Sequence, residues 1–122
     1  MNNLLIFILL PINLLAQEFV SSSSFESKTA KGTVVIEFWA EWNASNQVEF
    51  LPSLKDCESY RLCIVKGAHV QKKYKVTAIP TVIIFDNGVE QERFNPTIMM
   101  QLAATKKKVQ KSIDNITLSK FQ

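Results

Sequence analysis

The feature that most constrains this chain is the run TVVIEF at residues 33–38, which leads into two tryptophans at positions 39 and 42. Its residues are β-branched or aromatic apart from one acid, Glu37. Gly32 precedes the run, and the polar sequence NASN at residues 43–46 follows soon after it. An apolar run of this length between turn signals predicts a strand that is buried on both faces of a sheet.

The rest of the chain supplies strands and helices in alternation. Further strands are predicted at residues 17–21, 61–65 and 81–85, and the turn sequence DNG at 86–88 predicts an antiparallel return at 89–94. Helices are predicted at residues 25–30, 47–59, 70–74 and 105–118, with Pro52 kinking or splitting the second. This order predicts an α/β fold: a central mixed β-sheet with parallel strands and a C-terminal antiparallel hairpin, flanked by helices on both faces.

Length and composition fit one small domain. The chain has 122 residues, 47% of them hydrophobic. Residues 1–16, MNNLLIFILLPINLLA, resemble a secretory signal peptide, which leaves a domain at residues 17–122. We therefore expect export to a periplasmic or extracellular compartment of a bacterial cell, without stable membrane insertion after removal of the leader; an uncleaved anchor is the alternative. The net charge of +3 does not indicate a nucleic-acid partner.

The chain has two cysteines, Cys57 and Cys63, and no CxxC motif. They form no Cys/His cluster with the spacing of a zinc site, so neither a metal nor another cofactor is expected. Three alternatives remain for them: a structural disulfide, two buried free thiols, or a redox-active pair.

Four sequence patterns resemble the thioredoxin family: VVIEFWAEW at residues 34–42, KYKVTAIPT at 73–81, VIIFDNG at 82–88, and the closing helix. The resemblance implies a thioredoxin fold for nearly the whole domain. It also implies a cis peptide bond before Pro80, with Trp39 and Trp42 beside the active-site loop. Glu37 matches the buried acid of the family, and Arg61 falls where a basic residue often pairs with it.

The chain departs from the family at the reactive residues. Asn43 and Asn46 stand where the resemblance places the two cysteines. Dithiol exchange needs a thiolate at a helix N-terminus and a second thiol to resolve the mixed disulfide, and an amide supplies neither. We therefore expect no catalytic residue and no redox activity at this loop, and we expect the two asparagines to cap a helix instead. The degenerate active-site loop comprises Trp39, Trp42, Asn43, Ala44, Ser45 and Asn46.

The sequence predicts a protein- or peptide-binding protein, chaperone-like or part of an assembly, with an unidentified partner. An apolar groove beside the degenerate loop would bind the partner. Residues 97–104 either border this groove or belong to the core. One alternative is a thiol–disulfide oxidoreductase, or redox-homeostasis protein, that works through Cys57 and Cys63; another is a structural subunit of an envelope assembly. The expected groove comprises Trp42, Ala78, Ile79, Pro80, Thr81 and Phe94.

Overall fold

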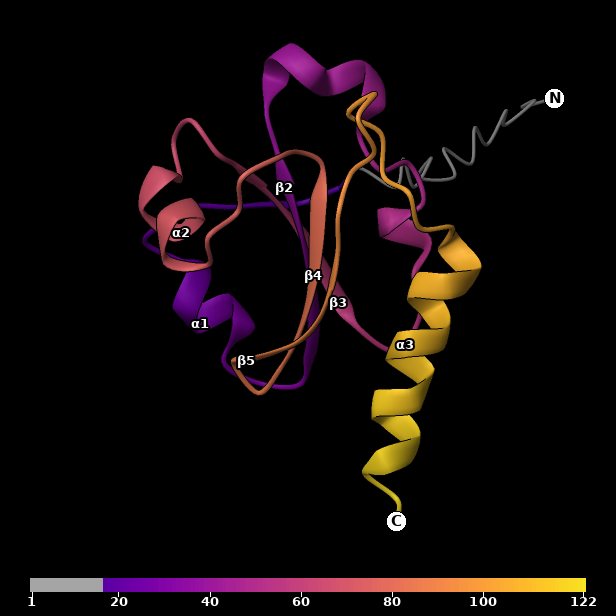
Figure 1. Ribbon diagram of the computed structural model, residues 1–122. Coiled ribbons are helices and arrows are strands. Elements are labelled where there is room, and N and C mark those ends of the chain that lie inside the picture. Colours follow the sequence, from indigo (N-terminus) through magenta and orange to yellow (C-terminus); the bar gives the residue numbers. More distant parts are fainter. Residues whose placement is uncertain (1–16) are drawn as a thin grey trace, which may run out of the picture.

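The computed structural model describes residues 17–122, so the predicted leader lies outside the described part. Five strands form one sheet in the order β1, β3, β2, β4, β5 (Figure 1). The pairs β1–β3 and β2–β3 are parallel, whereas β2–β4 and β4–β5 are antiparallel, which confirms the expected mixed sheet with a closing hairpin. The strand bounds are Phe19–Val20 (β1), Thr33–Trp39 (β2), Glu58–Cys63 (β3), Thr81–Asp86 (β4) and Val89–Phe94 (β5).

Helices cover both faces of the sheet, as expected (Figure 1). Helices α1 (Phe25–Thr29) and α2 (Ala68–Lys73) lie on one face, where Phe25 and Val70 join the apolar core. Helix α3 (Lys106–Ser119) lies on the other face, where Val109 and Ile113 are fully buried in a second apolar cluster. The sheet therefore separates two cores, and β2 at its centre contributes to both.

Strand β2 is buried along its length except for Trp39, in agreement with the prediction from its continuous apolar run. Its register against β3 places Glu37 opposite Arg61, and Trp39 opposite Cys63. The turn between β4 and β5 also agrees with its sequence, because Asn87 and Gly88 both have positive φ, at 50° and 82°. Two successive residues in that region suit a tight hairpin turn, and the pair Asn-Gly adopts it readily.

The helix predicted at residues 47–59 is absent, and this prediction was wrong. Two short 3-10 helices, η1 (Glu41–Asn46) and η2 (Leu51–Ser53), occupy the connection, and β3 begins at Glu58 rather than at Arg61. Pro52 is tolerated in the first turn of η2, but it has no N–H to donate to the Val48 carbonyl, so it disfavours a continuous helix through residues 47–59. The backbone of Val48 is bonded to side chains of the sheet instead of to a helix.

Candidate functional site

The degenerate loop is built where β2 ends. Trp39 is half-buried, whereas Trp42 in η1 is 65% exposed. The side-chain amide of Asn43 is buried and donates to the Met100 carbonyl at 3.1 Å, and Asn46 Nδ2 donates to Asn43 Oδ1 at 2.9 Å. Neither asparagine caps a long helix, so that expectation was wrong. Their side chains instead attach η1 to the segment that follows β5.

That segment, residues 95–103, is a small hairpin. Pro96 and Leu102 form an antiparallel bridge, and the Thr97 amide donates to the Gln101 carbonyl at 2.7 Å. At the tip, Ile98 is 97% exposed and Met99 is 71% exposed. Met100 and Leu102, in contrast, pack against the two cores. The segment is therefore neither all core nor all surface: its tip is exposed, and the residues after the tip pack against the cores.

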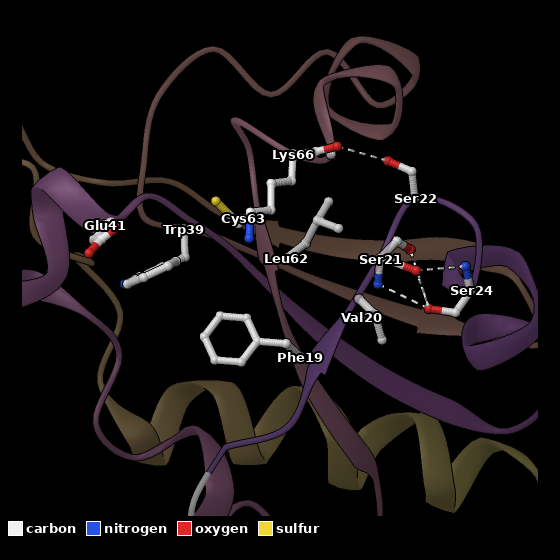
Figure 2. Close-up of a pocket in the computed structure, with 11 residues that line it drawn as sticks. Phe19, Val20, Ser21, Ser22, Ser24, Trp39, Glu41, Leu62, Cys63 and Lys66 are labelled. Atoms are coloured by element: carbon white, nitrogen blue, oxygen red, sulfur yellow. Dashed lines mark hydrogen bonds between the residues drawn. The ribbon is translucent and has the colours of Figure 1, made fainter.

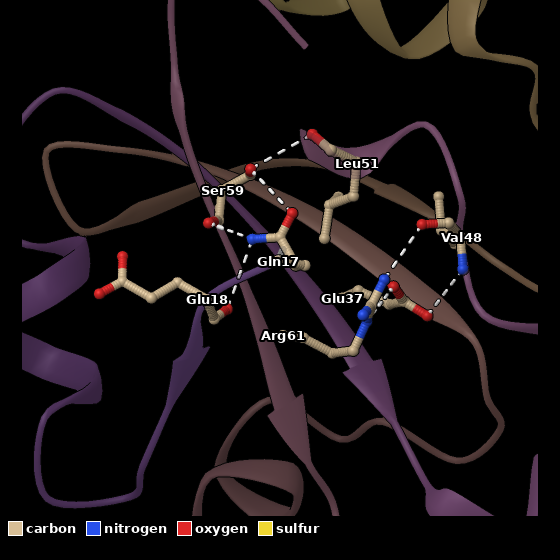
Figure 3. A network of polar contacts seen from close by, with 7 residues as sticks. All are labelled: Gln17, Glu18, Glu37, Val48, Leu51, Ser59 and Arg61. Carbon is tan, nitrogen blue, oxygen red and sulfur yellow. Dashed lines mark hydrogen bonds and ion pairs between the residues drawn. The ribbon is translucent and has the colours of Figure 1, made fainter. Parts of the chain in front are cut away.

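A buried ion pair joins the neighbouring strands β2 and β3. Arg61 Nε donates to Glu37 Oε1 at 2.9 Å, and both side chains are buried, so the expected pair is present (Figure 3). The second carboxylate oxygen accepts from the Val48 amide, and Arg61 Nη2 donates to the Val48 carbonyl, each at 3.1 Å. Burial raises the pKa of the Glu37 carboxyl above its ordinary value, although Arg61 and the Val48 amide act in the opposite direction.

The expected groove is only partly assembled. The Ile79–Pro80 peptide bond is cis, as the resemblance implied. Ile79, Pro80 and Thr81 are buried, however, and the exposed members of the expected groove are Ala78 and Trp42. Phe94 was placed wrongly: it is 6% exposed and packs in the core on the α3 side. Phe94 ends β5 opposite Val82, a residue of the same core cluster, whereas residues 89–92 of this edge strand are exposed.

The two cysteines are free, and the fold keeps them apart. Cys57 precedes β3 and Cys63 ends it, so about 20 Å of extended chain separates them, against the ~7 Å between Cα atoms that a disulfide allows. The alternatives of a structural disulfide and of a redox pair between these two residues are therefore wrong for this fold. Burial raises the pKa of the Cys57 thiol to about 11, and the neighbouring Glu58 and Asp56 carboxylates add to this effect.

A different hollow opens beside the exposed end of β2. It measures about 570 Å³ and lies between β1, the end of β3 and the turn that leads to α2 (Figure 2). A second hollow of about 450 Å³ shares three of its lining residues, Glu41, Cys63 and Lys66, and continues over Trp42 and Val65. The sequence interpretation missed this region because the resemblance directed attention to the other side of the loop. Trp39, Trp42 and Cys63 line these hollows and were named from the sequence, whereas Phe19 and Val65, apolar residues beside polar turns, were not.

Residues 17–122 contain neither a candidate metal centre nor a candidate membrane-spanning helix. No cluster of three or more histidine, cysteine or acidic side chains is arranged to bind a metal ion there. No helix in that part of the chain is both long and apolar enough to cross a membrane.

Comparison with known proteins identifies the family. No model of a known protein family matches the chain. Thioredoxin of Rickettsia bellii is 31% identical over 83 residues, which are 60% of this chain and 78% of that protein. Thioredoxin-1 of Saccharomyces cerevisiae is 28% identical over 97 residues, which are 71% of this chain and 94% of that protein. The chain belongs to the thioredoxin family.

Solved structures agree with the fold. A mutant thioredoxin from Halobacterium salinarum superposes with a TM-score of 0.64 over 83% of this chain and 90% of that one, at 18% identity. Thioredoxin of Malassezia sympodialis gives a TM-score of 0.63 over 82% and 90% of the two chains, at 20% identity. These two likenesses concern the thioredoxin fold alone.

Proposed function

We propose that this protein is a redox-inactive, exported member of the thioredoxin family that binds another protein or a peptide. One observation carries the proposal: the side chains of Asn43 and Asn46 are engaged with each other and with the Met100 carbonyl. The loop therefore has a structural attachment where disulfide exchange would need a free thiolate. Without a thiol at this position, the first step of exchange has no nucleophile.

The surface around the loop supports binding. Phe19, Trp42 and Val65 are 52%, 65% and 71% exposed at the same end of the molecule, and each lines one of the two hollows. Apolar and aromatic side chains that gather at a hollow are typical of sites where a partner docks. Trp42 is the member of the expected groove that belongs to this surface.

The alternative is thiol–disulfide exchange through a single cysteine. The relatives that carry the name thioredoxin favour it. Two facts weigh against it: Cys57 has a raised pKa of about 11, and Cys63 has no second thiol near it to resolve a mixed disulfide.

The insulin-reduction assay with dithiothreitol separates the two functions. We expect turbidity to develop no faster than with dithiothreitol alone, and equally slowly for Cys57→Ser and Cys63→Ser. Faster turbidity that disappears in either serine variant would establish the oxidoreductase instead. A photo-reactive residue at the exposed Ser45 position should crosslink one defined protein in the native host, and the mature protein should begin at Gln17 by mass spectrometry.

A further inference from the structure

We propose that the two adjoining hollows bind the C-terminal residue of a partner polypeptide, with its apolar side chain in the first hollow and its carboxylate at Lys66. This inference rests on the proposed binding function and names the chemistry that it recognises. It concerns the Phe19–Lys66 side of the loop, away from Pro80.

The walls of the first hollow suit a bulky apolar side chain. Phe19 and Trp39 meet edge to face with ring centroids 5.5 Å apart, and Val20 and Leu62 form the adjoining wall (Figure 2). A volume of about 570 Å³ lies within the range of pockets that enclose small organic groups. An aromatic or long aliphatic side chain would thus exchange water for aromatic contacts there.

Lys66 supplies the charge that selects a carboxylate. It lines both hollows and takes part in no ion pair among residues 17–122. Figure 2 shows its amine on the Cys63 side of the first hollow, with the other charged lining residue, Glu41, beyond Trp39. A ligand carboxylate would therefore meet the lysine, and Glu41 would disfavour an acidic residue farther along the ligand.

The arrangement of the hollows favours a chain end over a free acid or an internal acidic residue. The turn that holds Ser21, Ser22 and Ser24 bounds the first hollow on the side away from Glu41 (Figure 2). Ser21 and Ser24 hydrogen-bond to each other there, and the Ser22 hydroxyl donates to the Lys66 carbonyl, so a chain that enters from the second hollow meets this turn. The second hollow continues outward over Trp42 and Val65, where the preceding residues of a peptide would lie. Lys66 stands at the junction, where the α-carboxylate of a terminal residue would fall.

The protein carries its own reporters for a test. Its two tryptophans, Trp39 and Trp42, line one hollow each, so tryptophan fluorescence reports occupancy. Cys63 lines both hollows, whereas Cys57 lies at the far end of β3. In the full chain with Cys57→Ser, the rate of maleimide labelling at Cys63 therefore measures access to the site.

The test titrates this protein with acetyl-Ala-Ala-Phe as the free acid, with the same peptide as its amide, and with 3-phenylpropionate. We expect the free acid to change the fluorescence saturably, to slow labelling of Cys63, and to bind about fivefold more tightly than the amide, as one partly exposed ion pair allows. Lys66→Gln should reduce affinity for the acid to that for the amide. The matched variant Lys111→Gln, with the same charge change on α3, should leave the difference intact.

Several outcomes would overturn the inference. Equal affinity for acid and amide would remove the carboxylate subsite but leave peptide binding in place. Binding of 3-phenylpropionate as tight as that of the peptide would indicate a free-acid site. A response that Lys66→Gln does not alter, or one that leaves Cys63 labelling unchanged, would place the ligand elsewhere. Failure of the broader function would show separately, as insulin reduction that depends on a cysteine.

Discussion

Replacement of Arg61 by methionine should destabilise this protein strongly. The change leaves the Glu37 carboxylate 0% exposed with one remaining hydrogen bond, from the Val48 amide, and it leaves the Val48 carbonyl without its donor. Removal of one partner from a buried ion pair costs about 3–5 kcal/mol. Because the free energy of unfolding of a small domain is about 5–15 kcal/mol, the variant should be only marginally stable at neutral pH.

The loss should also depend on pH, with a definite sign. The folded-state pKa of Glu37 is already raised by burial, and in Arg61→Met it rises further because the lowering effect of the guanidinium is gone. An acid of this kind keeps its proton in the folded state after the unfolded state has released it. The stability is therefore full below the ordinary carboxyl pKa of about 4.3 and falls as the pH rises above it, by up to ~1.4 kcal/mol per pH unit.

The assay is urea denaturation followed by tryptophan fluorescence, at about pH 5 and about pH 8. Arg61→Lys should lie between the wild type and Arg61→Met, because it keeps the charge but cannot reach both Glu37 and Val48 as a fork does. Lys120→Met is the control: it removes a 2.7 Å ion pair with Asp86 that is partly exposed, so it should cost only about 0–1 kcal/mol. A loss for Arg61→Met below ~1 kcal/mol, or one that is equal at both pH values, would refute the reasoning.

Three further predictions follow from the site. Phe94→Ala should cost about 3–5 kcal/mol in urea denaturation because Phe94 is core, whereas Trp42→Ala should cost about 0.5 kcal/mol or less; a reversed order would return Phe94 to the surface groove. The rate at which iodoacetamide reacts with Cys57 should keep rising with pH until the pH reaches the thiol pKa of about 11. A pH–rate curve with its midpoint near the pKa of free cysteine would contradict the burial of this thiol. Asn43→Ala should cost about 1–2 kcal/mol and speed hydrogen exchange around Met100; unchanged exchange would mean that the bond does not hold the hairpin.

The elements that followed from sequence are those specified by local chemistry. The run at residues 33–38 predicts β2 because β-branched and aromatic residues suit a strand buried on both faces. Asn87-Gly88 predicts the β4–β5 turn because the two residues tolerate positive φ. Thr105 predicts the start of α3, where its hydroxyl accepts from the Lys108 amide at 3.3 Å. Each of these signals lies within a few residues of its effect.

The sequence predictions failed where contacts between residues far apart in the chain determine the structure. Apolar residues at helical spacing in residues 47–59 indicated a helix, but the backbone of Val48 is bonded by Glu37 and Arg61 from two other strands. The hollow beside Trp39 escaped prediction because it needs three separate segments, around Phe19, Trp39 and Lys66, to meet. The burial of Phe94 likewise depends on how the chain after β4 packs against α3.

The buried acid has a structural function although the degenerate loop contains no thiol. Glu37 binds the Val48 amide and the Arg61 side chain, and Arg61 binds the Val48 carbonyl, so the two side chains together hold both polar groups of one peptide position. Val48 lies two residues after Asn46 in the sequence, and its side chain packs in the core on the α3 side. Loss of the pair would therefore release the connection that follows the loop. For this reason Glu37→Gln should alter the free energy of unfolding more than any binding activity, since the amide cannot satisfy the guanidinium charge.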